Sequence, residues 1–159
     1  GAYPGIGAEE RGQAEAIARN IKEMALLRVP IVIIIIGEGA SGGALGVGLG
    51  DVVLMLENAW YCVISPEGCA SILWRDSSKA PQAAEALRFT SYDNLEHGVI
   101  DGVINEPPGG AHRDWELAAE LIGDQIAKAL QELEGLSYEE LIQQRVDKFR
   151  KMGKFKTLR

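Results

Sequence analysis

The feature that most constrains this chain is the stretch of residues 30–50, where an apolar run leads directly into a glycine-rich turn. Six β-branched residues, Ile31 to Ile36, predict a strand that is buried on both faces. Four glycines then allow backbone N–H groups to approach a ligand without an intervening Cβ: Gly37, Gly39, Gly42 and Gly43. Because these N–H groups fall at the positive end of a helix expected from Ser41, the turn is suited to holding an anion through its backbone.

Composition limits the classes of protein that remain. The chain has 159 residues, 47% hydrophobic and 25% charged, which predicts one globular domain with a sizeable core. Its formal net charge of -7 argues against binding nucleic acid or an anionic membrane through bulk electrostatics. No apolar run reaches the roughly 18 residues of a membrane span and no signal peptide is evident, so we expect a cytoplasmic protein.

The two cysteines do not form a recognisable site. Cys62 and Cys69 are too few for a disulfide framework or a four-ligand zinc site, and their spacing is not that of a CxxC redox pair. We therefore expect two core thiols and no metal bound by this chain.

The order of apolar and polar segments predicts an α/β layer followed by helices. A helical stripe covers residues 9–28, and a short helix from Ser41 is expected to end near Gly50. We expect strands at 52–56 and 60–64, a short apolar segment at 99–105, and helices at 66–74, 79–87, 92–97 and 114–133. A capping box at Ser137 predicts a last helix, and residues 148–159 form a basic tail typical of a solvated helix end. The breaker cluster at 107–110 suggests a core over residues 1–111 and a helical extension over 112–159.

One alternative is a dinucleotide site. Residues 37–42 match GxGxxG after a strand, and Glu57 lies twenty residues beyond Gly37. Against this interpretation, the helix that follows would contain Gly46 and Gly48, each of which costs about 0.8–1 kcal/mol relative to alanine. A full Rossmann crossover helix is therefore a poor fit, and we do not expect NAD or NADP to bind.

A second alternative makes Ser41 a nucleophile on a strand-to-helix turn, with His97 or His112 as its base. Nothing in the sequence places either histidine near Ser41. A serine at this position more often caps the helix. An activity assay of Ser41→Ala separates the two roles.

Five blocks of sequence together resemble one enzyme family. They are Gly1-Ala-Tyr-Pro-Gly5, Gly7-Ala-Glu-Glu-Arg-Gly-Gln13, Gly37-Glu-Gly-Ala-Ser-Gly-Gly-Ala-Leu45, Ser65-Pro-Glu-Gly-Cys-Ala-Ser-Ile-Leu-Trp74 and Gly109-Gly-Ala-His112. In this order they resemble the carboxyltransferase alpha subunits of the multisubunit acetyl-CoA carboxylases of bacteria and plastids. The resemblance runs the whole length of the chain and covers the C-terminal half of such a subunit, so we expect a fragment.

The resemblance implies both a fold and an activity. The fold is crotonase-like, a spiral of ββα units related to the ClpP protease and the enoyl-CoA hydratases, here with C-terminal helices. The family transfers a carboxyl group from carboxybiotin, held on the biotin carboxyl carrier protein, to acetyl-CoA, giving malonyl-CoA for fatty-acid synthesis. Its partners are the carboxyltransferase beta subunit, which carries a cysteine-bound zinc in bacteria, and biotin carboxylase. The location implied is the cytoplasm or the plastid stroma.

In that reaction, the resemblance implies that the glycine turn binds the substrate or biotin and stabilises negative charge. The backbone amides of Gly42 and Gly43 are the expected oxyanion-hole donors, and Gly37, Gly39 and Ser41 are expected to contact the substrate or biotin. A hydratase of the same fold needs two carboxylates, but the first of these positions is Leu45 and only Glu67 remains. Glu67 is then better explained as a helix-start or interface residue. Another CoA enzyme of this fold and a non-catalytic scaffold stay open as alternatives.

Overall fold

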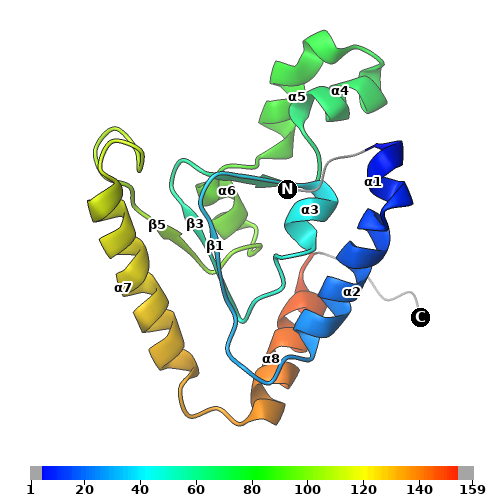
Figure 1. Ribbon diagram of the computed structural model, residues 1–159. Helices are drawn as coiled ribbons and strands as arrows, with labels where there is room; N and C mark the ends of the chain where they lie inside the picture. Colours follow the sequence, from blue (N-terminus) through cyan, green and yellow to red (C-terminus); the bar gives the residue numbers. More distant parts are fainter. Residues whose placement is uncertain (1–4, 154–159) are drawn as a thin grey trace, which may run out of the picture.

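The computed structural model describes residues 5–153, and residues 1–4 and 154–159 lie outside this described part. Its centre is a parallel sheet of three strands in the spatial order β1-β3-β5. These strands are β1 (Val32–Ile35), β3 (Val52–Leu56) and β5 (Gly102–Ile104). A second parallel pair joins β2 (Glu38–Ala40) to β4 (Trp60–Cys62), and Figure 1 shows the strands at the middle of the molecule.

The strands repeat one order along the chain. β1 in the first sheet is followed by β2 in the second sheet and then by α3 (Ser41–Leu45). β3 in the first sheet is followed in the same way by β4 in the second and by α4 (Pro66–Trp74). This repeat agrees with the crotonase-like ββα spiral that the family resemblance implied, and helices follow it. Because the ladders are parallel, the carboxyl ends of β1, β3 and β5 meet at one edge.

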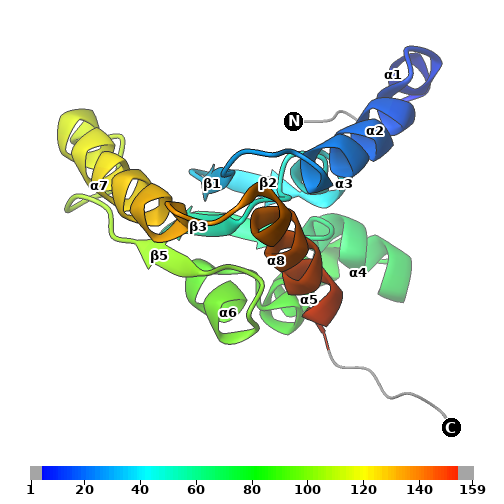
Figure 2. The same cartoon turned by 90° about the horizontal axis from the view of Figure 1, so that it is seen from below.

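Helices enclose the three-stranded sheet. α7 (Trp115–Leu133) contacts β1 and β5 on one side, while α2 (Gln13–Ala25) and α3 lie on the other side (Figure 1). α8 (Tyr138–Lys151) packs against α2, and α6 (Ser91–Glu96) packs against β4 and β5 (Figure 2). No helix within residues 5–153 is long and apolar enough to cross a membrane.

A helical pair projects from this body. It consists of α4, the short 3₁₀ turn η1 (Ser77–Lys79) and α5 (Ala80–Leu87), which pack mainly against one another (Figure 1). Ile72 and Leu73 of α4 are 70% and 65% exposed, so this pair presents apolar side chains outward.

Local capping signals fix the helix starts where the sequence predicted them. The Ser65 hydroxyl accepts a hydrogen bond from the Gly68 amide at 3.2 Å, and Pro66 fills the first turn of α4, where its missing N–H has no consequence. Ser137 and Glu140 form the predicted capping box of α8, in which each side chain accepts from the other's amide. The predicted helix over residues 66–74 and the predicted capping box at Ser137 are both confirmed, and the Ser65 cap is an addition that the structure supplies.

The predicted helix over residues 9–28 is in fact two helices. α1 (Ile6–Glu10) ends before Gly12, which has φ of 79°, and α2 begins at Gln13. A left-handed residue cannot continue a right-handed helix, so Gly12 separates the two. α3 likewise ends at Leu45 rather than near Gly50, and β4 ends at Cys62 rather than at residue 64.

Two burial predictions are wrong. Only Ile35 of β1 is buried, the other three residues of the strand are half-buried, and Ile36 just beyond it is 69% exposed. The β-branched run is therefore not buried on both faces. Cys62 and Cys69 are half-buried rather than core thiols, because one ends a two-stranded sheet and the other lies on the projecting α4.

A buried arginine ties the last helix to the sheet. Arg145 of α8 is 1% exposed and forms a two-pronged ion pair with Asp51, with N–O distances of 2.9 and 2.7 Å. Its remaining N–H groups donate to the carbonyls of Met24, Leu27 and Val29. The Asp51 carboxylate also accepts the Ile31 amide at 2.7 Å. One side chain thus fixes the end of α2 and the starts of β1 and β3.

Candidate functional site

The glycine segment follows the carboxyl end of β1 and is more ordered than a simple turn. Residues 38–40 form β2, which pairs with β4, and α3 begins at Ser41. Ala40 occupies the N-cap position, and Ser41 has φ of 54° with no capping hydrogen bond from its side chain. The interpretation of Ser41 as the helix cap is therefore wrong, and the residue instead adopts the left-handed backbone that turns the chain from β2 into α3.

The amides at the start of α3 have no hydrogen-bond acceptor in the described part of the protein. The first N–H groups of a helix have no intrahelical acceptor. Neither the Gly42 nor the Gly43 amide donates a hydrogen bond to any other described residue. The backbone therefore offers two adjacent donors beside the positive end of this helical turn.

A hollow of about 330 Å³, the glycine hollow, lies against β1, β2 and α3. It contains three of the predicted site residues, Gly37, Gly39 and Gly43. Its other lining residues are apolar for the most part: Ile33, Ile34, Ile35, Ile36, Glu38, Ala40, Ala44, Val47, Gly48 and Tyr61. An added Cβ on Gly37 would meet nothing within 4 Å, so the backbone there faces open space.

A second hollow of about 440 Å³, the histidine hollow, contains the other two predicted site residues, Ser41 and Gly42. It is lined further by Ala44, Leu45, Tyr61, Cys62, Val63, Leu87, Arg88, Asn94, His97 and Val99. Ala44 and Tyr61 line both hollows, so the two adjoin across α3 and β4. The predicted residues are thus brought to one region: Gly42 lines the histidine hollow, Gly43 lines the adjoining glycine hollow, and the two are neighbours at the start of α3.

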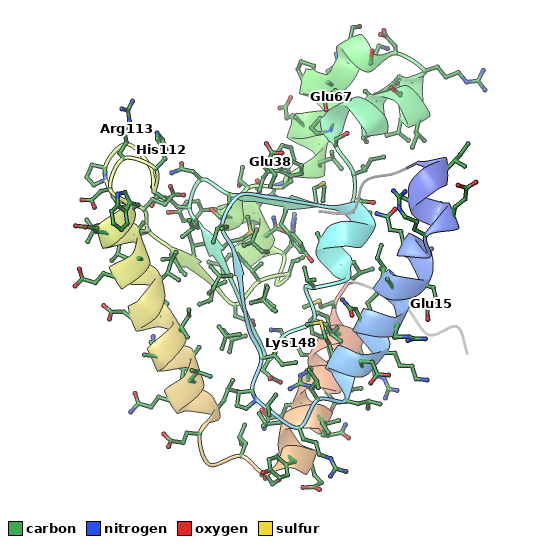
Figure 3. All side chains as sticks on the ribbon, viewed as in Figure 1. Glu15, Glu38, Glu67, His112, Arg113 and Lys148 are labelled. Carbon is green, nitrogen blue, oxygen red and sulfur yellow. The ribbon has the colours of Figure 1, made fainter. Side chains whose placement is uncertain are left out.

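The structure distinguishes the two histidines that the sequence left open as a base for Ser41. His97 lines the same hollow as Ser41, whereas His112 lies on the loop after β5, where Figure 3 labels it beside Arg113. No hydrogen bond joins Ser41 to His97 among the described residues, and no carboxylate lines their hollow. The carboxylate that orients the histidine in a serine triad is therefore missing from the lining of the histidine hollow.

The lack of a carboxylate in the lining of the histidine hollow also argues against the hydratase alternative. Leu45 lines the histidine hollow, while Glu67 is an exposed residue in the first turn of α4 (Figure 3). The position where a hydratase needs its first carboxylate is apolar, and Glu67 is not among the residues lining either hollow. These side chains do not form an acid–base pair for adding water.

The dinucleotide alternative is also disfavoured. Within the GxGxxG match, residues 38–40 form the strand β2 and residues 41–42 already belong to α3, which has only five residues. Glu57, the expected ribose ligand, accepts the Glu106 amide at 3.2 Å. No group of three or more His, Cys, Asp and Glu side chains within residues 5–153 is placed to hold a metal ion.

Glu106 fixes the loop that carries His112. Its carboxylate accepts the amides of Asn58 at 3.0 Å and Ala111 at 2.7 Å. Desolvation raises the pKa of Glu106, but these hydrogen bonds and the nearby His112 outweigh it and hold the pKa below its ordinary value. The loop therefore has a defined shape at the carboxyl edge of the sheet.

Tyr61 is a residue of both hollows that no sequence pattern indicated. It pairs in register with Gly39 across β2 and β4. A Cβ on Gly39 would lie 2.6 Å from the Tyr61 ring, and one on Gly48 would lie 2.6 Å from its hydroxyl. Gly39 and Gly48 are therefore required by the packing of this ring, which gives Gly39 a structural role in addition to its predicted contact with the substrate.

Gly39→Ala should destabilise the protein by about 1–3 kcal/mol, because the added methyl overlaps the Tyr61 ring. Gly37→Ala is the matched control in the same hollow and should stay within about 0.5 kcal/mol of the parent. Urea unfolding of the two variants measures both values. Adding Tyr61→Leu to Gly39→Ala should recover part of the loss, and equal stability of the two single variants would contradict this packing role.

Known structures identify the fold class first. A Pseudomonas malonate decarboxylase hetero-tetramer in complex with coenzyme A matches with a TM-score of 0.69, 16% identity, and coverage of 90% of this chain and 56% of that one. Transcarboxylase 12S matches with a TM-score of 0.65, 20% identity, and coverage of 81% and 24%. An enoyl-CoA hydratase from Mycobacterium avium subsp. paratuberculosis K-10 matches with a TM-score of 0.52, 23% identity, and coverage of 84% and 55%. The chain has the crotonase fold.

Sequence comparison then identifies the family. The family model described as "Acetyl co-enzyme A carboxylase carboxyltransferase-like" matches residues 1–153. The acetyl-coenzyme A carboxylase carboxyl transferase subunit alpha of Geobacter metallireducens is 61% identical over 155 residues, and that of Flavobacterium psychrophilum is 59% identical. Each match covers 98% of this chain and 49% of the relative. The chain belongs to this carboxyltransferase family and spans about half the length of these relatives.

Proposed function

We propose that this chain is part of an acetyl-CoA carboxylase carboxyltransferase alpha subunit that moves a carboxyl group from carboxybiotin to acetyl-CoA, giving malonyl-CoA for fatty-acid synthesis. The observation that carries the proposal is the pair of unpartnered amides, Gly42 and Gly43, at the start of α3. They occur in a chain whose family model matches residues 1–153. The proposed location is the cytoplasm.

The residues of the glycine hollow suit a neutral, largely apolar ring with one polar edge. Gly37 leaves open space above its Cα, and Ile36 and Val47 supply apolar wall. Gly39 brings the backbone of β2 to the ligand, and Ser41, which lines the adjoining histidine hollow, extends the proposed contact to the first residue of α3. This combination supports binding of the biotin group, which supplies a carboxylated ring nitrogen next to a ureido oxygen.

The proposed catalytic role belongs to the backbone. As the carboxyl group departs, the amides of Gly42 and Gly43 donate to the ureido oxygen, on which negative charge develops. Donors fixed in a helix start need no reorganisation at that moment, and one well-aimed donor contributes roughly 2.7–4 kcal/mol to transition-state stabilisation. Neither Ser41 nor Glu67 is required to exchange a proton, because the basic oxygen left on biotin can accept the methyl proton of acetyl-CoA.

Partners follow from the same proposal. We expect the beta subunit to provide a second glycine pair for the acetyl-CoA enolate, the biotin carboxyl carrier protein to deliver carboxybiotin, and biotin carboxylase to recharge it. The exposed apolar residues Val63, Ile72 and Leu73, at 74%, 70% and 65% exposure, support a protein partner near α4. No metal is assigned to this chain in the proposal.

Reconstitution tests the function. Full-length alpha subunit carrying this sequence is mixed with the beta subunit, carboxybiotinylated carrier protein and labelled acetyl-CoA, and malonyl-CoA is measured. We expect product only when alpha and beta subunits are both present. If alpha binds beta but the mixture forms no product, the chain is a scaffold. Hydration of crotonyl-CoA by alpha alone would instead support the hydratase alternative.

A further inference from the structure

Tyr61 occupies the wall that separates the two hollows. It lies in the middle of β4 and lines both the glycine hollow and the histidine hollow. Its hydroxyl abuts Gly48, because a Cβ added there would lie 2.6 Å from that oxygen. Gly48 lines only the glycine hollow, so the hydroxyl end of the ring is on the side of Gly43.

The position of this ring is fixed on several sides. The Tyr61 amide donates to the Phe89 carbonyl at 3.1 Å, and its own carbonyl accepts from the Asn94 side chain at 3.1 Å. The ring lies over Gly39, its register partner on β2, at a distance that leaves no room for a Cβ. Two hydrogen bonds thus fix the Tyr61 backbone, and the close approach of Gly39 and Gly48 confines its ring, as a positioned donor requires.

The Tyr61 hydroxyl has no hydrogen-bond partner within the described part of the protein. It makes no hydrogen bond to any described residue, and no side-chain N or O atom within residues 5–153 is both buried and without a partner. The Tyr61 oxygen must therefore be accessible, although its residue is half-buried. Burial raises the pKa of the phenol above its ordinary value, so the group keeps its proton at neutral pH and remains a donor.

We propose that the Tyr61 hydroxyl is a further hydrogen-bond donor to the ligand oxygen in the glycine hollow, acting beside the Gly43 amide. This inference rests on the proposed function, in which that oxygen belongs to the ureido group of biotin. A fixed neutral donor strengthens its hydrogen bond as the oxygen gains negative charge. The proton stays on the phenol oxygen throughout, so no bond of the tyrosine is broken.

Tyr61→Phe is the decisive variant, because it keeps the ring over Gly39 and removes only the hydroxyl. In the complex of full-length alpha and beta subunits, we expect kcat for malonyl-CoA formation to fall about ten- to a hundredfold, with little change in KM for acetyl-CoA. Tyr138→Phe is the matched control, since Tyr138 is 58% exposed at the start of α8. Urea unfolding of Tyr61→Phe should match the parent.

Binding of biocytin, biotin linked to lysine, to the same complexes gives a readout apart from activity. By calorimetry, we expect Tyr61→Phe to raise Kd about tenfold and Tyr138→Phe to leave it unchanged. Unchanged Kd together with kcat within twofold of the parent would overturn the role of Tyr61. If the parent complex forms no malonyl-CoA, the proposed function fails, and an unchanged biocytin Kd in Tyr61→Phe then overturns the donor role separately.

Discussion

Replacing Arg145 by methionine should lower the free energy of unfolding by about 3–5 kcal/mol, because it leaves the Asp51 carboxylate without its buried ion-pair partner. The carbonyls of Met24, Leu27 and Val29 lose their donors in the same step. Both effects act where α2 ends and where β1 and β3 begin. Urea unfolding of the alpha subunit should show a lower midpoint with an unchanged slope.

Two comparisons isolate the cause of that loss. Arg150→Met changes an exposed arginine on the same helix and should stay within about 0.5 kcal/mol of the parent. Arg145→Lys keeps the positive charge but has three donors, where the guanidinium has five, and should fall between the two. A loss below about 1 kcal/mol in Arg145→Met would contradict the buried network as a main source of stability.

Arg145 illustrates what the sequence could not predict. In the helical pattern of residues 138–151 it is one charged residue among several, and the pattern gives no reason to bury it. Its burial depends on Asp51 and on three carbonyls that lie more than 90 residues earlier in the chain. Signals confined to neighbouring residues, such as Pro66 in a first helical turn and the Ser137 capping box, were sufficient to place α4 and α8.

In the candidate site, too, features set by neighbouring residues were predicted, and features that depend on distant residues were not. The run from Ile31 to Gly43 indicated a strand and a helix start, and both are present as β1 and α3. β2 was missed because its short ladder depends on residues 60–62, about twenty residues further along. Tyr61 was missed for the same reason, since Gly39 and Gly48 explain it only after the ring is seen to lie over them. The placement of His97 on the same hollow as Ser41 likewise depends on α6 packing against β4.

Gly43→Val in the full-length alpha subunit, paired with beta, should lower kcat for carboxyl transfer by about a hundredfold or more. Gly43 lines the glycine hollow, and its amide has no partner among the described residues, so a branched side chain would crowd the ureido oxygen or turn the N–H away from it. Loss of one such donor costs roughly 2.7–4 kcal/mol of transition-state stabilisation. The KM for acetyl-CoA should change much less, because the lost interaction forms as charge develops.

Ser41→Ala and Glu67→Gln are the controls for this assignment, and each should cost far less than Gly43→Val. Ser41 makes no hydrogen bond to His97 among the described residues, and Glu67 is exposed in the first turn of α4. Urea unfolding and co-purification with the beta subunit show whether the Gly43 variant is still folded and assembled. If a folded Gly43→Val complex keeps near-normal kcat while Ser41→Ala abolishes turnover, the oxyanion role of this amide is wrong. The shared hollow of Ser41 and His97 would then be the place to seek a nucleophile and its base.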